Sequence, residues 1–318
     1  MRFAFTDDQL ELRDAVRDLL AKECTPQHVR EAWSNETGRV PGLWQQLADM
    51  GVVGILAREA AGGLGLTEVD LVLILEETGR VSLPEPIVET AAVVAPWLQR
   101  VPENGATVGG PFVGLAPWAD TVDVRVVLDA TMREVDAAAW RSRPSVDGSR
   151  RLFDVDWEST VAPDDAAAAL AFERGSLGTA AQLCGLADRM IELTVDYVKE
   201  RRQFGVAVGS FQAVKHHLAN ARLSLEFARP LVYRAAYSIA HEHPDRSVHV
   251  SMAKANASDA ALVAARVALQ CHGAIGYTTE YDLHLYLKRT WALARAWGDA
   301  AWHRSRVEHH ILGGTSNG

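Results

Sequence analysis

Cysteines, long apolar runs and blocks of positive charge are all scarce in this sequence. Its three cysteines, Cys24, Cys184 and Cys271, lie far apart and form no Cys-x-x-Cys motif, so we interpret them as reduced core thiols. No run of about 18 apolar residues occurs, which argues against a membrane span. The net charge of −9, without a long basic block, argues against a general binder of nucleic acids or anionic membranes.

The N-terminal residues also have few features of a secretion signal. They read MRFAFTDDQLELRD, with charges where a signal peptide is apolar. Reduced cysteines are typical of the cytosol, and the lack of a signal peptide favours the same compartment. We therefore expect a cytoplasmic protein.

Metal-binding motifs are another absence. The 11 histidines include the pairs His216-His217 and His309-His310, but no Glu-x-x-His occurs in the sequence. A di-iron centre in a four-helix bundle requires that spacing, because it places a carboxylate and an imidazole on one helix face. We predict no metal site and interpret these histidines as surface residues or partners in hydrogen bonds between helices.

The N-terminal part of the sequence has the patterning of helices. With 318 residues, 48% of them hydrophobic, the chain can bury one large core or several smaller ones. Thr6 followed by Gln9 forms a capping box and predicts the start of the first helix. Further helices are predicted over residues 42–50 and from about Thr67.

Three glycines, Gly62, Gly63 and Gly65, precede the helix that is expected from Thr67. A phosphate-binding loop follows a strand, and no strand is predicted before these residues. We therefore interpret the glycines as turn residues with positive φ.

Residues 101–165 change to short β-favouring runs interleaved with glycine, proline and aspartate. The runs 112–115 and 122–128 predict strands of a small sheet. Helical spacing then returns, and a long apolar stripe with short connections predicts a four-helix bundle. The sequence thus predicts a mostly α fold with an N-terminal helical domain at 1–100, a reduced β-rich middle region at 101–165 and a C-terminal bundle at 166–318.

The segment 197–219, YVKERRQFGVAVGSFQAVKHHLA, predicts an elbow between two helices of the bundle. The first helix is expected to end near Arg201 and the chain to turn at Phe204-Gly205. The next helix then has Gln212 near its N-terminal end. Two arginines at such a place suit a polyanion, and the alternative is an ordinary helical hairpin with solvated arginines.

A second motif, QCHGAIGYT over residues 270–278, ends another predicted helix at a glycine. A glycine turn at a helix end lets a backbone or a ligand approach closely, because no Cβ intervenes. Simple capping of the helix explains the same pattern. On the residues alone, both interpretations stay open.

Both motifs resemble signatures of the acyl-CoA dehydrogenases. The pieces FTDDQ, LADMGVVGIL, EAAGGLGL and LEETGRV, in that order, are also similar to the N-terminal helical domain of that family. In the family, residues of the two motifs contact an FAD that is shared with a neighbouring subunit. The resemblance therefore implies FAD as the cofactor and the contact residues Arg201, Phe204, Gln212, Gln270 and Gly273. The second glycine of the family's glycine motif is Ala274 here, which departs from the pattern.

The catalytic base of the family is missing from its usual positions. Acyl-CoA dehydrogenation requires a carboxylate that removes the α-proton while a hydride moves to the flavin. By resemblance, one position for that glutamate is Trp297 and the other, early in the long bundle helix, is Gly175. Glu173 is two residues away, which turns it by about 200° around the helix. We interpret Glu173 as a solvated side chain paired with Arg174 or another nearby charge, and keep it as the alternative base.

The short middle region and the missing base are similar to the small subunit of heterotetrameric acyl-CoA dehydrogenases from bacterial steroid and cholesterol catabolism. Residues 101–165 lack the tract that lines the flavin ring in the family. The resemblance implies a larger partner subunit that holds the ring, the base and the acyl-CoA, in particular a hydrindane-carboxyl-CoA from steroid rings. The alternatives are a self-sufficient homo-oligomeric dehydrogenase with Glu173 as base, and a non-enzymatic helical scaffold.

Overall fold

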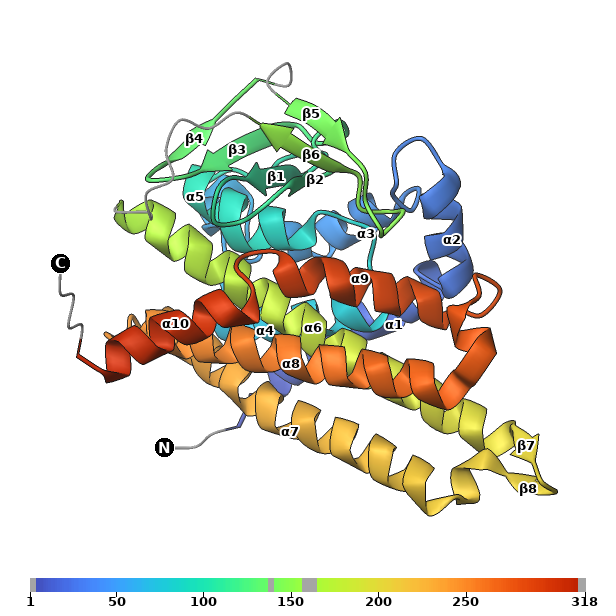
Figure 1. The fold of residues 1–318 in the computed structure, drawn as a ribbon. Coiled ribbons are helices and arrows are strands. Elements are labelled where there is room, and N and C mark those ends of the chain that lie inside the picture. Colours follow the sequence, from blue (N-terminus) through green and yellow to red (C-terminus); the bar gives the residue numbers. More distant parts are fainter. Residues whose placement is uncertain (1–3, 137–139, 156–164, 314–318) are drawn as a thin grey trace.

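Helices make up most of the chain, and a small β-rich region lies at one end of them (Figure 1). The computed structural model describes residues 4–136, 140–155 and 165–313. The long helix α6, Ala166–Glu200, runs through the middle and contacts both the N-terminal and the C-terminal helices. The mostly α fold predicted from the sequence is confirmed. None of the helices in the described ranges combines the length and the hydropathy that a membrane span requires.

The N-terminal helices cover one side of α6. They are α1 (Asp7–Glu23), α2 (Pro26–Ser34), α3 (Leu43–Asp49), α4 (Glu68–Arg80) and α5 (Ala95–Leu98), with short helical turns η1 (Val52–Gly54) and η2 (Glu59–Ala61) and a π-helical segment η3 (Val88–Val94). The predicted capping box is present, because the Gln9 amide N–H donates to Thr6 Oγ1 at 3.3 Å and the Thr6 N–H donates to Gln9 Oε1 at 3.0 Å. Helix α2 was not predicted, although Thr25 caps it in a similar way.

The glycines before α4 serve two different purposes. Gly62 and Gly65 have φ of +81° and +62°, as expected for turn residues. The same expectation is wrong at Gly63, which has no positive φ. A Cβ at Gly63 would lie 2.2 Å from the carbonyl oxygen of Ala57, so this position requires a residue without a side chain.

The β-rich region contains two three-stranded sheets where one was predicted. The first has the order β1 (Ala106–Gly109), β3 (Val124–Leu128), β4 (Met132–Glu134), and the second β2 (Ala116–Pro117), β6 (Leu152–Val155), β5 (Trp140–Arg143). Strands β1 and β3 are parallel, and the other pairs are antiparallel. Strand β3 corresponds to the predicted run 122–128. The predicted strand at 112–115 is wrong, because Gly110 and Gly114 bond to each other and the chain reverses there.

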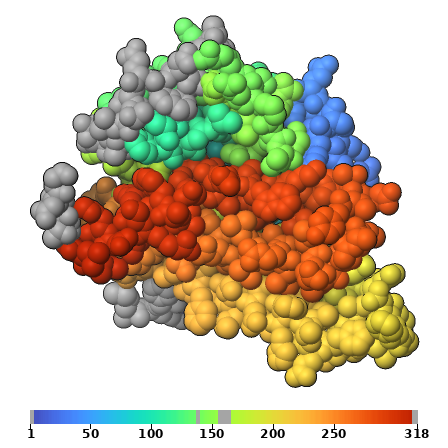
Figure 2. Space-filling view, in the orientation of Figure 1, coloured from blue at the N-terminus to red at the C-terminus, as the bar shows by residue number. Residues whose placement is uncertain are grey.

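The C-terminal helices form the predicted bundle. They are α6, α7 (Gln212–Ala240), α8 (Arg246–His272) and α9 (Leu283–Arg295), and α10 (Ala300–Ile311) packs on α8. Figure 2 shows α8, α9 and α10 as one continuous face below the β-rich region. The first two turns of α7 carry mostly exposed side chains, so this end of the helix projects beyond the bundle (Figure 1).

Helices α4 and α6 touch through their backbones. A Cβ at Gly79 would lie 2.1 Å from the carbonyl oxygen of Gln182, and a Cβ at Gly185 would lie 1.9 Å from that of Glu76. Two glycines at the crossing therefore let the helix axes approach more closely than side chains allow. The N-terminal helices and the bundle are held at a short, fixed distance.

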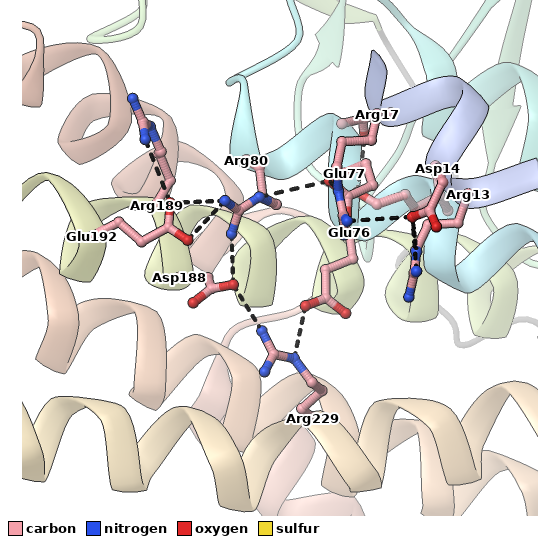
Figure 3. A network of polar contacts seen from close by, with 12 residues as sticks. Arg13, Asp14, Arg17, Glu76, Glu77, Arg80, Asp188, Arg189, Glu192 and Arg229 are labelled. Atoms are coloured by element: carbon pink, nitrogen blue, oxygen red, sulfur yellow. Dashed lines mark hydrogen bonds and ion pairs between the residues drawn. The ribbon is translucent and has the colours of Figure 1, made fainter. Parts of the chain in front are cut away.

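Ion pairs surround this crossing and join α4, α6 and α7 (Figure 3). Arg80 of α4 donates to Asp188 at 2.6 Å and to Glu192 at 2.7 Å. Arg229 of α7 donates to Glu76 at 2.7 Å and to Asp188 at 3.1 Å. Burial raises the pKa of Glu76, and the charge of Arg229 opposes that rise. The network therefore pairs charges that are buried between the N-terminal helices and the bundle. The domain boundaries predicted near residues 100 and 165 stay a prediction.

Candidate functional site

The elbow predicted between two bundle helices connects α6 to α7. Its elements are the end of α6 at Glu200, the hairpin strands β7 (Arg202–Gln203) and β8 (Val206–Ala207), the turn η5 (Val208–Ser210) and the start of α7 at Gln212. Phe204 and Gly205, between the two strands, have φ of +52° and +81°. Positive φ at both central residues is what a type I′ hairpin turn requires. The predicted turn at Phe204-Gly205 is confirmed.

Phe204 combines backbone strain with exposure. Its side chain is 91% exposed and lies edge-on to Phe211, with ring centroids 6.5 Å apart. A bulky residue with positive φ costs on the order of 1 kcal/mol or more, and such strain persists mostly at functional positions. The hairpin therefore presents an aromatic ring to solvent at a backbone position that glycine or asparagine fits better.

A pocket of about 680 Å³ lies beside the elbow, where the C-terminal ends of α6 and α8 meet the N-terminal end of α7. Its lining comprises Tyr197, Arg201, Gln203, Val208, Ala213, Val214, His217, Gln270, Cys271, His272, Gly273, Ala274 and Ile275. The structure thus brings together three of the five predicted contact residues, Arg201, Gln270 and Gly273. Phe204 and Gln212 lie on the same elbow but outside this lining.

The polar groups of the pocket suit an anion. No aspartate or glutamate is among its described lining residues, and Arg201, Gln203 and Gln270 have no side-chain hydrogen-bond or ion-pair partner in the part of the chain that the structure describes. An unpaired guanidinium and two unpaired amides fit the diphosphate and the hydroxyl groups of a dinucleotide.

The end of α8 supplies the opposite wall. Gly273 has φ of +63°, and open space surrounds its Cα where a Cβ would stand. His272 is buried, and its Nδ1 lies 2.8 Å from the carbonyl oxygen of Ala268. Cys271, expected to be a core thiol, is only partly buried and lines the pocket. Gln203, His217 and Cys271 lie within the two segments singled out from the sequence but were not predicted as contacts, because which side chains face the pocket depends on how the helix ends meet.

Glu173 differs from its predicted state. The side chain is 5% exposed rather than solvated, and it accepts a hydrogen bond from Arg246 Nε at 2.8 Å. Arg174 instead pairs with Glu68 at 2.7 Å. Burial raises the pKa of Glu173, and the charge of Arg246 opposes that rise. The prediction of a solvated carboxylate was wrong because its partner lies on another helix, distant in the sequence.

The two positions at which the family resemblance places the base are in contact with each other. Trp297 is 2% exposed, and a Cβ on Gly175 would lie 2.4 Å from Cε3 and Cζ3 of its indole. The Trp297 backbone is fixed as well, since its N–H donates to Val113 and its carbonyl oxygen lies 2.8 Å from His303 Nε2. The indole therefore fills the space into which a carboxylate at residue 175 would project.

Metal chemistry has no visible site in the described ranges. No group of three or more histidine, cysteine, aspartate or glutamate side chains there has an arrangement that could hold a metal ion.

Two solved structures have the same fold. A variant of the Tcur3481-Tcur3483 steroid ACAD superposes with a TM-score of 0.82 at 24% identity, covering 98% of this chain and 99% of that chain. The ChsE4-ChsE5 complex from Mycobacterium tuberculosis superposes with a TM-score of 0.83 at 21% identity, covering 98% and 99%. At these identities the similarity shows the fold alone.

Sequence comparison is more specific. The profile of the acyl-CoA dehydrogenase N-terminal domain matches residues 6–101, and that of the C-terminal domain matches residues 165–312. The acyl-CoA dehydrogenase IpdE2 of Mycolicibacterium smegmatis is 31% identical over 95% of this chain and 98% of its own length. IpdE2 of Mycobacterium tuberculosis is 30% identical over 89% and 91%. With both terminal domains matched and its relatives aligned over most of their length, the chain belongs to the acyl-CoA dehydrogenases, a family of FAD-dependent oxidoreductases.

Proposed function

We propose that this chain is one subunit of a cytoplasmic, heterotetrameric acyl-CoA dehydrogenase. In this assembly it contributes contacts to a shared FAD, while a larger acyl-CoA dehydrogenase subunit holds the isoalloxazine ring, the acyl-CoA and the catalytic base. The contact of Trp297 with Gly175 carries the proposal. Neither position offers a carboxylate, and no proton acceptor fits at residue 175 while the indole is in place.

The pocket at the elbow supports the cofactor part of the proposal. Bound FAD supplies the hydride acceptor of the dehydrogenation. Arg201 places a permanent positive charge in the pocket, where it can pair with the diphosphate. Gln270 offers an amide for the nucleotide hydroxyls, and Gly273 leaves room for a close approach. On the rim of the elbow, Phe204 presents its ring and Gln212 begins α7.

The relatives support the heteromeric and steroid parts of the proposal. One structural neighbour is a complex of two differently named chains, ChsE4 and ChsE5, and the other is named as a steroid ACAD. For the present chain we extend this to α,β-dehydrogenation of a CoA thioester derived from steroid rings, in particular a hydrindane-carboxyl-CoA, at the site of the partner.

The alternative of a self-sufficient dehydrogenase depends on Glu173. A general base must have its carboxylate free to reach the substrate proton. The bond from Arg246 engages one carboxylate oxygen of Glu173, so the structure disfavours this role. If the chain were a helical scaffold without FAD, the unpaired guanidinium and amides of the pocket would have no ligand to bind.

Flavin content tests these possibilities directly. We expect the chain to be colourless when purified alone and to co-purify with its larger partner as a yellow heterotetramer. In that complex, Glu173→Gln is expected to leave turnover near the wild-type value. A yellow, active protein from this chain alone, inactivated by Glu173→Gln, would contradict the proposal. Absence of flavin from every combination of subunits would instead support the scaffold.

Phe204 allows a test that separates folding from binding. Phe204→Asn creates an Asn-Gly pair, which fits a type I′ turn without strain. We expect it to stabilise the isolated chain by about 1 kcal/mol in urea unfolding and to weaken FAD binding to the complex about tenfold, through the lost aromatic contact. Phe227→Ala is the control, because Phe227 is 69% exposed and lies outside the pocket lining. Unchanged FAD affinity in Phe204→Asn would remove Phe204 from the contact residues.

A further inference from the structure

His217 is a pocket residue that neither predicted motif contains as a contact. It lies in the second turn of α7, four residues after Ala213, and both side chains line the same pocket as Arg201. The imidazole is exposed, and no hydrogen bond, ion pair or ring contact joins it to the rest of the described chain. Its neighbour His216 is also exposed but does not line the pocket. The two adjacent histidines therefore differ in position relative to the site.

Other ionisable groups lie in or near the pocket. They are Tyr197 and Arg201 at the end of α6, Cys271 and His272 at the end of α8, and on α7 itself the nearby Lys215 and His216 lie outside the lining. Burial lowers the pKa of His272 and raises the pKa of Cys271, so it favours the uncharged imidazole and the uncharged thiol. The Tyr197 hydroxyl donates to the His272 carbonyl oxygen at 3.4 Å.

We propose that His217 is a further FAD-binding residue, which in its protonated form adds a second positive charge beside Arg201 and makes FAD binding tighter in mildly acidic solution. This inference rests on the proposed function of the pocket. No carboxylate among the described lining residues competes with a bound diphosphate for the imidazolium. Histidine is the side chain whose charge ordinarily changes between about pH 5 and 8.

The direction of the pH effect follows from linkage. A bound diphosphate favours the charged imidazole, so the complex with FAD binds more protons than the complex without it. Binding is therefore accompanied by proton uptake, and affinity rises as the pH falls. We expect the Kd for FAD to be about sixfold lower at about pH 6 than at about pH 8.

The test is a titration of the flavin-depleted heteromeric complex with FAD at about pH 6 and about pH 8. His217→Gln keeps a polar side chain of similar reach but cannot become charged. We expect wild type and the matched control His216→Gln to show the sixfold pH effect, and His217→Gln to lose most of it, with its largest loss of affinity at the lower pH. Calorimetry in buffers of different ionisation enthalpy is expected to show proton uptake in wild type that His217→Gln reduces.

The outcomes distinguish this inference from the function on which it rests. A complex that binds no FAD in any form, or one that keeps FAD fully after Arg201→Glu, contradicts the proposed function. A complex that loses FAD after Arg201→Glu, but in which His217→Gln keeps the wild-type pH dependence and proton uptake, leaves that function standing and overturns the role of His217. Equal effects of His216→Gln and His217→Gln would overturn it as well, since they would reflect the general charge of α7.

Discussion

Replacing Arg201 with glutamate is expected to remove FAD from the heteromeric complex while the chain stays folded. The Arg201 side chain is exposed and has no hydrogen-bond or ion-pair partner within the described residues, so the substitution breaks no side-chain contact of that kind. In the proposed complex it replaces a cation beside the diphosphate with an anion. We expect the Kd for FAD to rise at least about 100-fold, corresponding to about 2.7 kcal/mol, in flavin titrations of the complex.

Arg202→Glu provides the matched control for this experiment. It makes the same change of charge one residue further along, but Arg202 lies in β7 and outside the pocket lining. Its effect on FAD binding is expected to be small and to disappear with added salt, as for other interactions between exposed charges. Full retention of FAD by the Arg201→Glu complex, or equal losses in both variants, would show that Arg201 does not contact the cofactor.

Truncation of Trp297 to alanine is expected to destabilise the chain by about 3–5 kcal/mol. The indole is buried against Gly175 and lies 6.2 Å from the ring of Phe172, measured between centroids. Its removal leaves a cavity that the fixed backbone of α6 cannot close. The difference in unfolding free energy includes the loss of the indole's contact with the buried Glu89 as well as the lost packing. Urea unfolding followed by circular dichroism measures it without relying on the lost fluorophore.

A second substitution tests whether the two residues share one space. Gly175→Ala alone is expected to cost about 1–3 kcal/mol, because the new methyl group meets the indole. In the double variant with Trp297→Ala, the methyl occupies part of the cavity. We therefore expect the combined loss to be smaller than the sum by at least about 1 kcal/mol. Additive losses would show that Gly175 and Trp297 do not compete for the same volume.

Local chemistry made much of the fold predictable. The capping box at Thr6 and the glycine turn after α8 each depend on residues within one turn of each other, so the sequence contains the whole signal. Strands were less predictable, because they depend on partners elsewhere in the chain. The segment 112–115 includes β-favouring side chains, yet Gly110 and Gly114 pair with each other and close a tight reversal there. The parallel pairing of β1 with β3 has no signature in either strand alone.

In the candidate site, too, features set by neighbouring residues could be predicted, and those set by distant residues could not. The elbow was predictable because its turn and its arginines are contiguous in the sequence, and the pocket indeed contains Arg201. His217 was not, since its position in the pocket depends on how the ends of α6 and α8 meet α7. The burial of Glu173 was missed for a related reason. Its partner Arg246 comes from the start of a helix that no periodicity connects to it.

The packing of Trp297 on Gly175 also restricts how this chain can change through evolution. A glutamate at residue 175 has no room while the indole is present. If the indole is lost before residue 175 changes, the chain loses a large share of its folding free energy, which is typically only about 5–15 kcal/mol. Either substitution alone destabilises the chain and is therefore selected against before the second substitution can follow. This mutual dependence between two mutations keeps the chain from acquiring a carboxylate at residue 175 one step at a time.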